Sequence, residues 1–238
     1  MILNNDYYWF KSALTDDQCD EIILRGERQM SLAQERGESL EAATFGGKDK
    51  ASMLESGLSE DDLVSQGSKT TQTIQKEKAK GKNTFIRDTH VSWLDDDEIY
   101  SWILPYLARA NHDAGWDFES SWSEVLQFTK YNKHQFYGWH ADANANPYSP
   151  EVENPNYVGK IRKLSMTVNL TDPKNYKGGN LKFDFGPHAE KSRYHTCTEI
   201  RPRGSIIVFP SDRFHQVTPI TSGLRYSLVM WSLGQPWK

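Results

Sequence analysis

The sequence predicts a mainly β protein with flanking helices (α+β), built on a double-sheet jelly roll or barrel. From Trp122 onward, eight strand-length segments follow one another, separated by turn signals such as Asp172-Pro173 and Gly178-Gly179. Before them, two segments carry apolar residues at helical spacing. With 8 Trp, 11 Tyr and 10 Phe, the chain also has the large side chains of a β-rich core.

The chain of 238 residues suits one domain that carries an insertion. We expect helical support over 1–36, a polar insertion over 37–83 and the β core over 84–238. The net charge of -4 indicates no global attraction to nucleic acid. Because no membrane-length apolar run and no signal peptide are visible, a soluble cytoplasmic protein is expected. The two cysteines, Cys19 and Cys197, lie outside any metal-type spacing and are expected to be free thiols.

The N-terminal part predicts a strand, a helix and an excursion. Tyr7–Phe10 has strand composition. Thr15 and Gln18 then match a capping box, which starts a helix that runs to about Arg36. Between Gly37 and Gly81 apolar residues are sparse, so we interpret this stretch as an insertion. It is either a lid that contacts substrate or a solvated surface loop.

A second strand and helix precede the β-rich part. Asn83–Trp93 has strand character. Asp95–Glu98 places carboxylates in the first turn of a helix, where the dipole favours them. The apolar residues of Ile99–Ala110 recur at helical spacing, so this helix is expected to pack on a sheet. Pro105 is expected to kink it, and Gly115 marks its end.

The β-rich part contains one connection that is longer than the others. Ala143–Lys160 is rich in Asn and Pro and is a candidate lid, because long loops often carry function. The eight predicted strands are Glu124–Tyr131, Gln135–Asp142, Ile161–Leu170, Asn180–Phe185, His195–Ile200, Ser205–Phe209, His215–Pro219 and Leu224–Leu233.

A potential metal site begins with His140 and Asp142. Two residues apart on a strand, they project from the same face. One imidazole and one carboxylate are two of the three ligands in the facial triad of non-haem Fe(II) oxygenases. His215 is the leading third ligand, because it starts a strand after an apolar strand and a turn. The other histidines are expected to be exposed or hydrogen-bonded; they are His90, His112, His134, His188 and His195.

Arg225 suggests a second component of the same site. On the predicted strand it shares one face with Ser227, Val229 and Trp231. An arginine that points into an apolar sandwich needs a partner, because a buried unpaired charge is very costly. The partner is either an Asp or Glu in a structural salt bridge or a dicarboxylic co-substrate, to which Ser227 adds a hydroxyl donor.

Seven motifs occur in the order of one known family. They are Gln127–Tyr131, Trp139–Asp142, Arg162–Pro173, Tyr176–Leu181, Gly204–Pro210, Phe214-His215 and Gly223–Ser227. Through them, the chain from about Phe85 onward resembles the Fe(II)- and 2-oxoglutarate-dependent dioxygenases of the prolyl 4-hydroxylase type. It is especially similar to bacterial and phage members related to the PKHD-type hydroxylases. The stretch from Gly37 to Gly81 has no matching counterpart.

The resemblance implies a double-stranded β-helix, which is a jelly roll, with its N-terminal helices on the major sheet. It assigns iron to His140, Asp142 and His215. It places Arg225 on the distal carboxylate of 2-oxoglutarate, and it implies further co-substrate contacts from Tyr131 and Asn169. Fe(II), 2-oxoglutarate and O2 are the expected cofactors and co-substrates, with ascorbate as an accessory reductant.

The implied reaction is hydroxylation of a C–H bond with release of succinate and CO2. Our leading hypothesis is a prolyl or other residue of a peptide or protein as substrate. Hydroxylation of a small molecule or free amino acid, nucleobase oxidation and a non-catalytic jelly-roll binding module are the alternatives. Trp231 and Tyr137 are the substrate-side candidates, although strand alternation places Tyr137 and Trp139 on the face opposite His140, which favours core packing.

Overall fold

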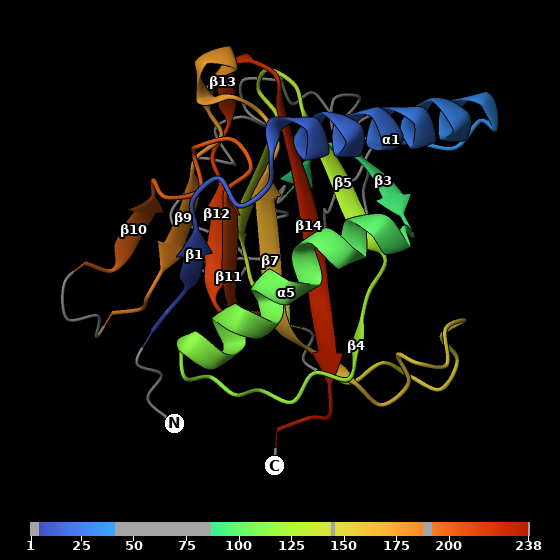
Figure 1. Ribbon diagram of the computed structural model, residues 1–238, viewed down its shortest axis with the longest axis vertical. Coiled ribbons are helices and arrows are strands. Elements are labelled where there is room, and N and C mark those ends of the chain that lie inside the picture. Colours follow the sequence, from blue (N-terminus) through green and yellow to red (C-terminus); the bar gives the residue numbers. More distant parts are fainter. Residues whose placement is uncertain (1–4, 41–86, 144–145, 188–191, 238) are drawn as a thin grey trace, which may run out of the picture.

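The computed structural model describes residues 5–40, 87–143, 146–187 and 192–237. Two antiparallel sheets face each other, and two helices cross the outer side of the larger sheet (Figure 1). This is the predicted jelly-roll core with flanking helices. Most of the predicted insertion over 37–83 lies outside the described residues.

The larger sheet has seven strands in the order β1-β11-β7-β14-β5-β3, with β4 paired to β14. Its long central strands β7 and β14 pair over most of their length. The strands are β1 (Tyr8–Phe10), β3 (His90–Leu94), β4 (Trp122–Ser123), β5 (Leu126–Tyr131), β7 (Ile161–Asn169), β11 (Ile206–Pro210) and β14 (Arg225–Gly234).

The smaller sheet has five strands in the order β10-β9-β12-β6-β2. They are β2 (Arg87–Asp88), β6 (Phe136–His140), β9 (Leu181–Asp184), β10 (Tyr194–Cys197) and β12 (Phe214–Val217). A separate ribbon joins β8 (Tyr176–Gly178), which follows the 3-10 helix η1 (Pro173–Asn175), to β13 (Ile220–Gly223). The sequence did not predict β4, β8 or β13 as separate strands.

Helix α1 (Asp16–Glu35) begins with the predicted capping box. The Gln18 main-chain N–H donates to the Thr15 hydroxyl over 3.2 Å, and the Thr15 N–H donates to the Gln18 side chain over 2.9 Å. Helix α5 (Asp97–Asp113) starts at the cap residue Asp96 and continues through Pro105. Neither described helix combines the length and apolar character that crossing a membrane requires.

Both helices bury their apolar faces on the outer side of the larger sheet. Gly26 shows how closely α1 approaches, because a Cβ there would lie 2.4 Å from the ring of Phe128 on β5. Glycine is therefore required by contact rather than by backbone conformation. The fully buried members of this core include Ile22, Ile99, Ile103, Leu126, Phe128, Leu164, Met166, Val168, Ile206 and Leu228.

One predicted strand divides in two. The described part of Asn83–Trp93 forms β2 and β3, which belong to different sheets and are separated by Thr89. Strand β2 pairs with β6, whereas β3 pairs with β5. The chain therefore crosses from one layer to the other at Thr89. Both cysteines are buried and free, as predicted.

Candidate metal and co-substrate site

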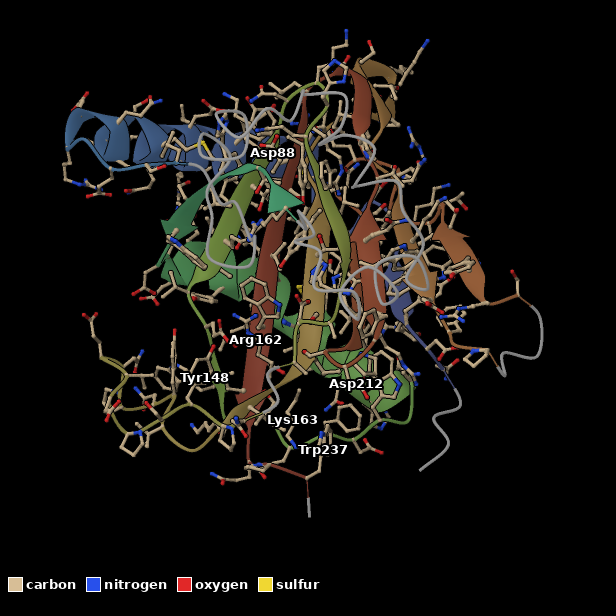
Figure 2. The ribbon with its side chains drawn as sticks, turned by 180° about the vertical axis from the view of Figure 1, so that it is seen from behind. Asp88, Tyr148, Arg162, Lys163, Asp212 and Trp237 are labelled. Atoms are coloured by element: carbon tan, nitrogen blue, oxygen red, sulfur yellow. The ribbon has the colours of Figure 1, made fainter. Side chains whose placement is uncertain are left out.

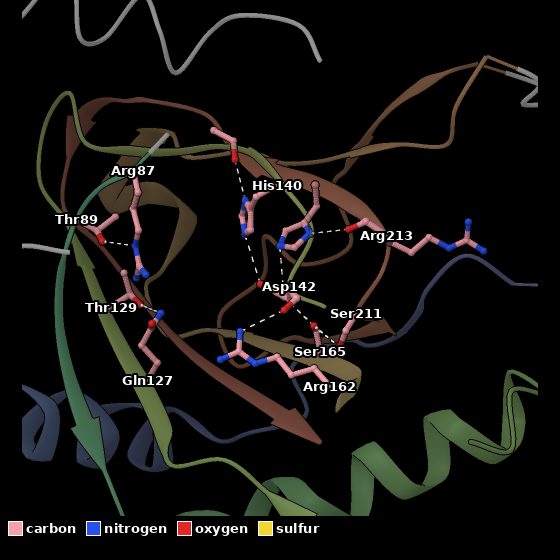
Figure 3. Close-up of polar contacts among 12 residues, drawn as sticks. Arg87, Thr89, Gln127, Thr129, His140, Asp142, Arg162, Ser165, Ser211 and Arg213 are labelled. Atoms are coloured by element: carbon pink, nitrogen blue, oxygen red, sulfur yellow. Dashed lines mark hydrogen bonds and ion pairs between the residues drawn. The ribbon is translucent and has the colours of Figure 1, made fainter. Parts of the chain in front are cut away.

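The three predicted metal ligands meet between the two sheets. His140 ends β6 and lies directly opposite His215 on β12, and Asp142 follows two residues after β6. The Nε2 atom of His140 is 3.4 Å from Oδ1 of Asp142, and Nε2 of His215 is 3.6 Å from Oδ2 (Figure 3). The potential ligand atoms all lie within 4.8 Å of one another. One ion can therefore contact all three side chains.

Main-chain carbonyls orient both imidazoles. Nδ1 of His140 lies 2.7 Å from the carbonyl oxygen of Gly138, and Nδ1 of His215 lies 2.9 Å from that of Arg213. A carbonyl only accepts hydrogen bonds, so in each neutral ring the proton sits on Nδ1. The lone pair of each Nε2 is then free for a metal ion, which is the usual arrangement of metal-binding histidines.

The protonation states also suit metal binding. Burial, reinforced by the nearby His140, lowers the pKa of His215 to about 4. Burial by itself raises the pKa of Asp142, but His215, His140 and Arg162 outweigh it and hold this pKa far below its usual range. At neutral pH the site therefore holds a neutral His215 and an ionised Asp142. Metal binding needs ligands in these deprotonated forms.

We expect the metal-free protein to lose stability as the pH falls from about 6.5 toward 4. The pKa of His215 is lower in the folded state than in the unfolded state, so in this range the unfolded chain binds an extra proton and is favoured. The loss amounts to about 3 kcal/mol at most, since each unit of pKa difference corresponds to about 1.4 kcal/mol. Urea unfolding of chelator-treated protein, compared with His215→Gln, measures it. If the free energy of unfolding falls equally with pH in the two proteins, the loss of stability does not come from His215.

A cavity extends from the three ligands along the inner face of β14. It is lined in part by Arg225, Ser227, Val229 and Trp231, the four residues predicted to share a strand face. Other lining residues include Gln127, Tyr131, Tyr137, His140, Asp142 and His215. The structure thus joins the metal-ligand trio and Arg225 in one space.

Arg225 is a buried cation without a protein counter-ion among the described residues. Its side chain is 2% exposed, its Nη1 lies 3.4 Å from the Ser227 hydroxyl, and its Nε–H has no partner. No Asp or Glu among the described residues forms an ion pair with Arg225, so its guanidinium can still bind an anionic group. A ligand carboxylate fits here, because it accepts two parallel hydrogen bonds from a guanidinium.

Tyr131 and Asn169 take different positions. Tyr131 faces Arg225 across the β5–β14 pair, lines the cavity and has its ring centroid 5.3 Å from the guanidinium carbon. Burial raises its pKa, so the phenol keeps its proton and can donate it in a hydrogen bond. Asn169 does not line the cavity. Its amide donates to the carbonyls of Thr171 and Arg201, over 2.9 and 2.8 Å.

The face predicted for Tyr137 is wrong. Its ring stacks on His140 with 3.5 Å between centroids, and Tyr137 lines the cavity. The reason is an irregularity in the β6–β12 pair, in which His215 pairs with His140 but Val217 pairs with Tyr137. Three residues of β6 thus span two of β12, which is the signature of a β-bulge and reverses the alternation. Trp139 is buried, packs near Tyr194 and lies outside the cavity lining.

The guanidinium of Arg87 packs against the ring of Tyr137, although Arg87 itself does not line the cavity. It lies 4.6 Å from the Tyr137 ring centroid, and its Nε–H donates to the Thr89 hydroxyl over 2.9 Å. The sequence offered only a strand pattern at this position.

A buried ion pair that the sequence did not reveal supports the site. Arg162 of β7 donates twice to the carboxylate of Glu124, over 2.5 and 2.6 Å. Its guanidinium carbon lies 3.8 Å from the Trp231 ring centroid, and Nη1 lies 3.4 Å from the main-chain oxygen of Asp142. Tyr148 donates to the same Glu124 over 2.8 Å, and Figure 2 shows it at the same end of the sandwich as Arg162. This pair thereby ties the loop after β6 to the cavity wall.

A pair of buried serines extends from the carboxylate of Asp142. The Ser165 hydroxyl lies 2.7 Å from Oδ2 of Asp142 and 2.9 Å from the Ser211 hydroxyl. The sequence did carry a signal for Ser165, since it is a hydroxyl residue between Leu164 and Met166 in an apolar strand.

Comparison with known proteins agrees with this geometry. Residues 126–233 match the 2OG-Fe(II) oxygenase superfamily. The chain is 35% identical over 105 residues to a PKHD-type hydroxylase from Alteromonas mediterranea, covering 44% of this chain and 41% of the relative. It is 32% identical over 106 residues to the PKHD-type hydroxylase YbiX of Escherichia coli, covering 44% and 40%. The match thus spans about two fifths of the length of each relative.

Solved structures share the fold over nearly the whole chain. The viral collagen prolyl hydroxylase of Paramecium bursaria Chlorella virus-1, in complex with 2OG, has a TM-score of 0.56 and 14% identity, and 97% of each chain is covered. A prolyl-4-hydroxylase of Pseudomonas putida has the same TM-score and identity, with 98% of this chain and 95% of that chain covered. At this identity the likeness concerns the fold.

Proposed function

We propose that this chain, whose residues 126–233 match the 2OG-Fe(II) oxygenase superfamily, hydroxylates a C–H bond of a peptidyl substrate, a prolyl residue in the first instance. One observation carries the proposal. The buried Arg225 lacks a protein counter-ion among the described residues. It lines the same cavity as the imidazoles of His140 and His215 and the carboxylate of Asp142. A site for metal alone does not require this cation.

Each residue has a distinct task in the proposed reaction. His140, Asp142 and His215 hold Fe(II), because two imidazoles and a carboxylate form the facial donor set of Fe(II) oxygenases. Arg225 binds the distal carboxylate of 2-oxoglutarate, with Ser227 and Tyr131 as neighbouring hydroxyl donors. When both are bound, they supply the chemistry that reduces O2, converts 2-oxoglutarate to succinate and CO2, and places one oxygen atom in the substrate.

The substrate side of the cavity is aromatic. Trp231 and Tyr137 line it, and each is held by a guanidinium, that of Arg162 or that of Arg87. Flat rings that are fixed in this way suit a prolyl ring, which they contact through dispersion and exclusion of water. Two solved structures that share the fold, a viral collagen prolyl hydroxylase and a bacterial prolyl-4-hydroxylase, support the same substrate class.

Two measurements test this function in order. Fe(II) and 2-oxoglutarate, added together without oxygen, are expected to produce a visible charge-transfer band, and oxygen with ascorbate should then yield succinate. Next, proline-containing peptides are expected to gain one oxygen in mass, whereas free amino acids and nucleotides are not. No band in metal-loaded protein would reject the site. Oxygen gain only by free amino acids or small molecules would reject the peptidyl substrate while leaving the chemistry in place.

A further inference from the structure

Asp142 has unequal surroundings at its two oxygens. Oδ2 accepts a hydrogen bond from Ser165 over 2.7 Å, whereas Oδ1 faces His140 Nε2 at 3.4 Å and has no hydroxyl partner among the described residues (Figure 3). Ser165 is fully buried and lies in the central strand β7, between Phe209 of β11 and Trp231 of β14. The strand that carries this hydroxyl is therefore held in place on both sides.

The direction of the hydrogen bonds among Asp142, Ser165 and Ser211 follows from the single proton that each serine hydroxyl carries. An ionised carboxylate only accepts, so the Ser165 hydroxyl must donate its single proton to Oδ2. The contact of 2.9 Å between the two serine hydroxyls is then a bond in which Ser211 donates to Ser165. Ser211 is 1% exposed, so water does not replace it without a change in structure. The result is a directed chain that runs from Ser211 through Ser165 to Asp142.

The turn that contains Ser211 also contacts the other parts of the site. The main-chain oxygen of Ser211 accepts from the N–H of Ala143, the residue after Asp142, over 2.8 Å. The N–H of Ser211 donates to the carbonyl of Lys163 on β7 over 3.0 Å. Two residues later, the carbonyl of Arg213 accepts from His215. One short turn thus fixes the orientation of two metal ligands.

We propose that Ser165 and Ser211 are positioning residues that reserve Oδ2 of Asp142 for the protein and leave Oδ1 as the single carboxylate oxygen for the metal ion. This inference rests on the proposed function, because it concerns the same Fe(II) site. Binding through one oxygen leaves more of the metal's coordination positions for ligands other than protein. Hydrogen bonds to metal-bound groups commonly change metal affinity by about 10- to 100-fold.

Mn(II) binding and the visible spectrum of the Co(II)-substituted protein test the proposal without turnover. Ser165→Ala is expected to weaken Mn(II) binding about 10- to 100-fold and to change the Co(II) bands, because Oδ2 becomes free to bind the ion. Ser211→Ala is expected to change both measurements in the same direction but less. Ser165 then loses the hydrogen bond that it accepts from Ser211 and keeps the one that it donates to Asp142. The matched control is Ser92→Ala, which removes a buried hydroxyl that donates to the Gly26 carbonyl over 3.0 Å and does not line the cavity. It should leave both measurements unchanged.

Two results separate the inference from the function on which it rests. Mn(II) affinity and Co(II) bands like those of the wild type in both Ser165→Ala and Ser211→Ala would overturn the positioning role, while the metal site would stand. If Ser165→Ala does not fold, Ser211→Ala decides alone by the same two measurements. Failure of the wild-type protein to bind Mn(II) would overturn the proposed function and the inference together.

Discussion

Replacing Asp142 with alanine is expected to abolish metal-dependent turnover while the fold is kept. The carboxylate supplies the only negative charge among the three proposed ligands, and both imidazoles lie within 3.6 Å of it. Without it, two neutral imidazoles remain, a weak site for Fe(II). We expect succinate formation to fall at least about 1,000-fold, which corresponds to roughly 4 kcal/mol of activation free energy. Mn(II) binding, measured on the same preparation, should be lost in parallel.

The fold of the variant must be checked separately, since Asp142 is buried. Its removal leaves Ser165 without an acceptor but also removes a desolvated charge, so the two effects oppose each other. Circular dichroism and the urea midpoint of the metal-free protein measure the net change.

Asp184→Asn provides the matched control. This aspartate is 8% exposed, similar to the 7% of Asp142. Its carboxylate pairs with Arg193, and it does not line the cavity. Loss of that ion pair is expected to lower stability and leave Mn(II) binding intact. Wild-type succinate yield in Asp142→Ala would remove this residue from the metal site.

The sequence predicted the three residues that converge between the sheets because their pattern is local or lies at strand ends. His140 and Asp142 are two residues apart, so strand geometry alone brings them together. His215 is distant in sequence, but its position at the start of a strand after an apolar strand and a turn identified it. The structure adds the pairing of β6 with β12, which sets the two histidines opposite each other.

The contacts among the supporting residues were not predictable, because they join positions that are far apart in the sequence. Glu124 and Arg162 are 38 positions apart, and Ser165 and Ser211 are 46 apart. Each pair depends on which strands become neighbours, and no local pattern reports that. The sequence pattern predicts Glu124 only as the first residue of a strand, whereas in the structure its carboxylate accepts hydrogen bonds from Arg162 and Tyr148.

Tyr137 shows a second limit of sequence patterns. Strict alternation assigns it to the face opposite His140, and a bulge in β6 reverses that assignment. A bulge adds one residue to one strand, and its position depends on the partner strand as much as on local sequence. Thr89, where the chain changes sheets, is a similar case, because an uninterrupted strand pattern concealed the crossing.

Arg225→Ala is expected to weaken 2-oxoglutarate binding about 150-fold, which corresponds to about 3 kcal/mol, the usual scale for truncating one partner of a buried hydrogen-bonded charge pair. The effect should appear as a raised KM for 2-oxoglutarate, with Mn(II) affinity unchanged. The 2-oxoglutarate affinity of Arg225→Lys is expected to lie between those of the wild type and Arg225→Ala. Lysine keeps the charge but cannot donate two parallel hydrogen bonds to a carboxylate. Arg201→Ala is the matched control. Its guanidinium also lies over a tyrosine ring, that of Tyr176, but Arg201 does not line the cavity.

A co-substrate analogue identifies the interacting group. 2-Oxopentanoate has the carbon chain of 2-oxoglutarate without the distal carboxylate. If Arg225 binds that carboxylate, the wild-type protein should bind 2-oxoglutarate more tightly than the analogue. The ratio should be about the factor by which Arg225→Ala weakens 2-oxoglutarate binding. Arg225→Ala itself should bind the two compounds almost equally. Such a double cycle isolates the pairwise interaction. An equal loss of affinity for both compounds would instead indicate that Arg225 shapes the cavity.

Although loss of Arg225 should weaken co-substrate binding, it should not lower the stability of the ligand-free protein. The buried guanidinium has an unpartnered Nε–H and no described counter-ion, so without co-substrate it is a desolvated charge that lowers stability. Arg225→Met, which keeps much of the side-chain volume, is therefore expected to unfold at an equal or higher urea concentration than the wild type. Adding 2-oxoglutarate with Mn(II) should reverse the order, because only the wild type gains strongly from binding. A ligand-free Arg225→Met that is clearly less stable than the wild type would show that the protein already compensates the charge of the guanidinium, and the co-substrate assignment would lose its physical basis.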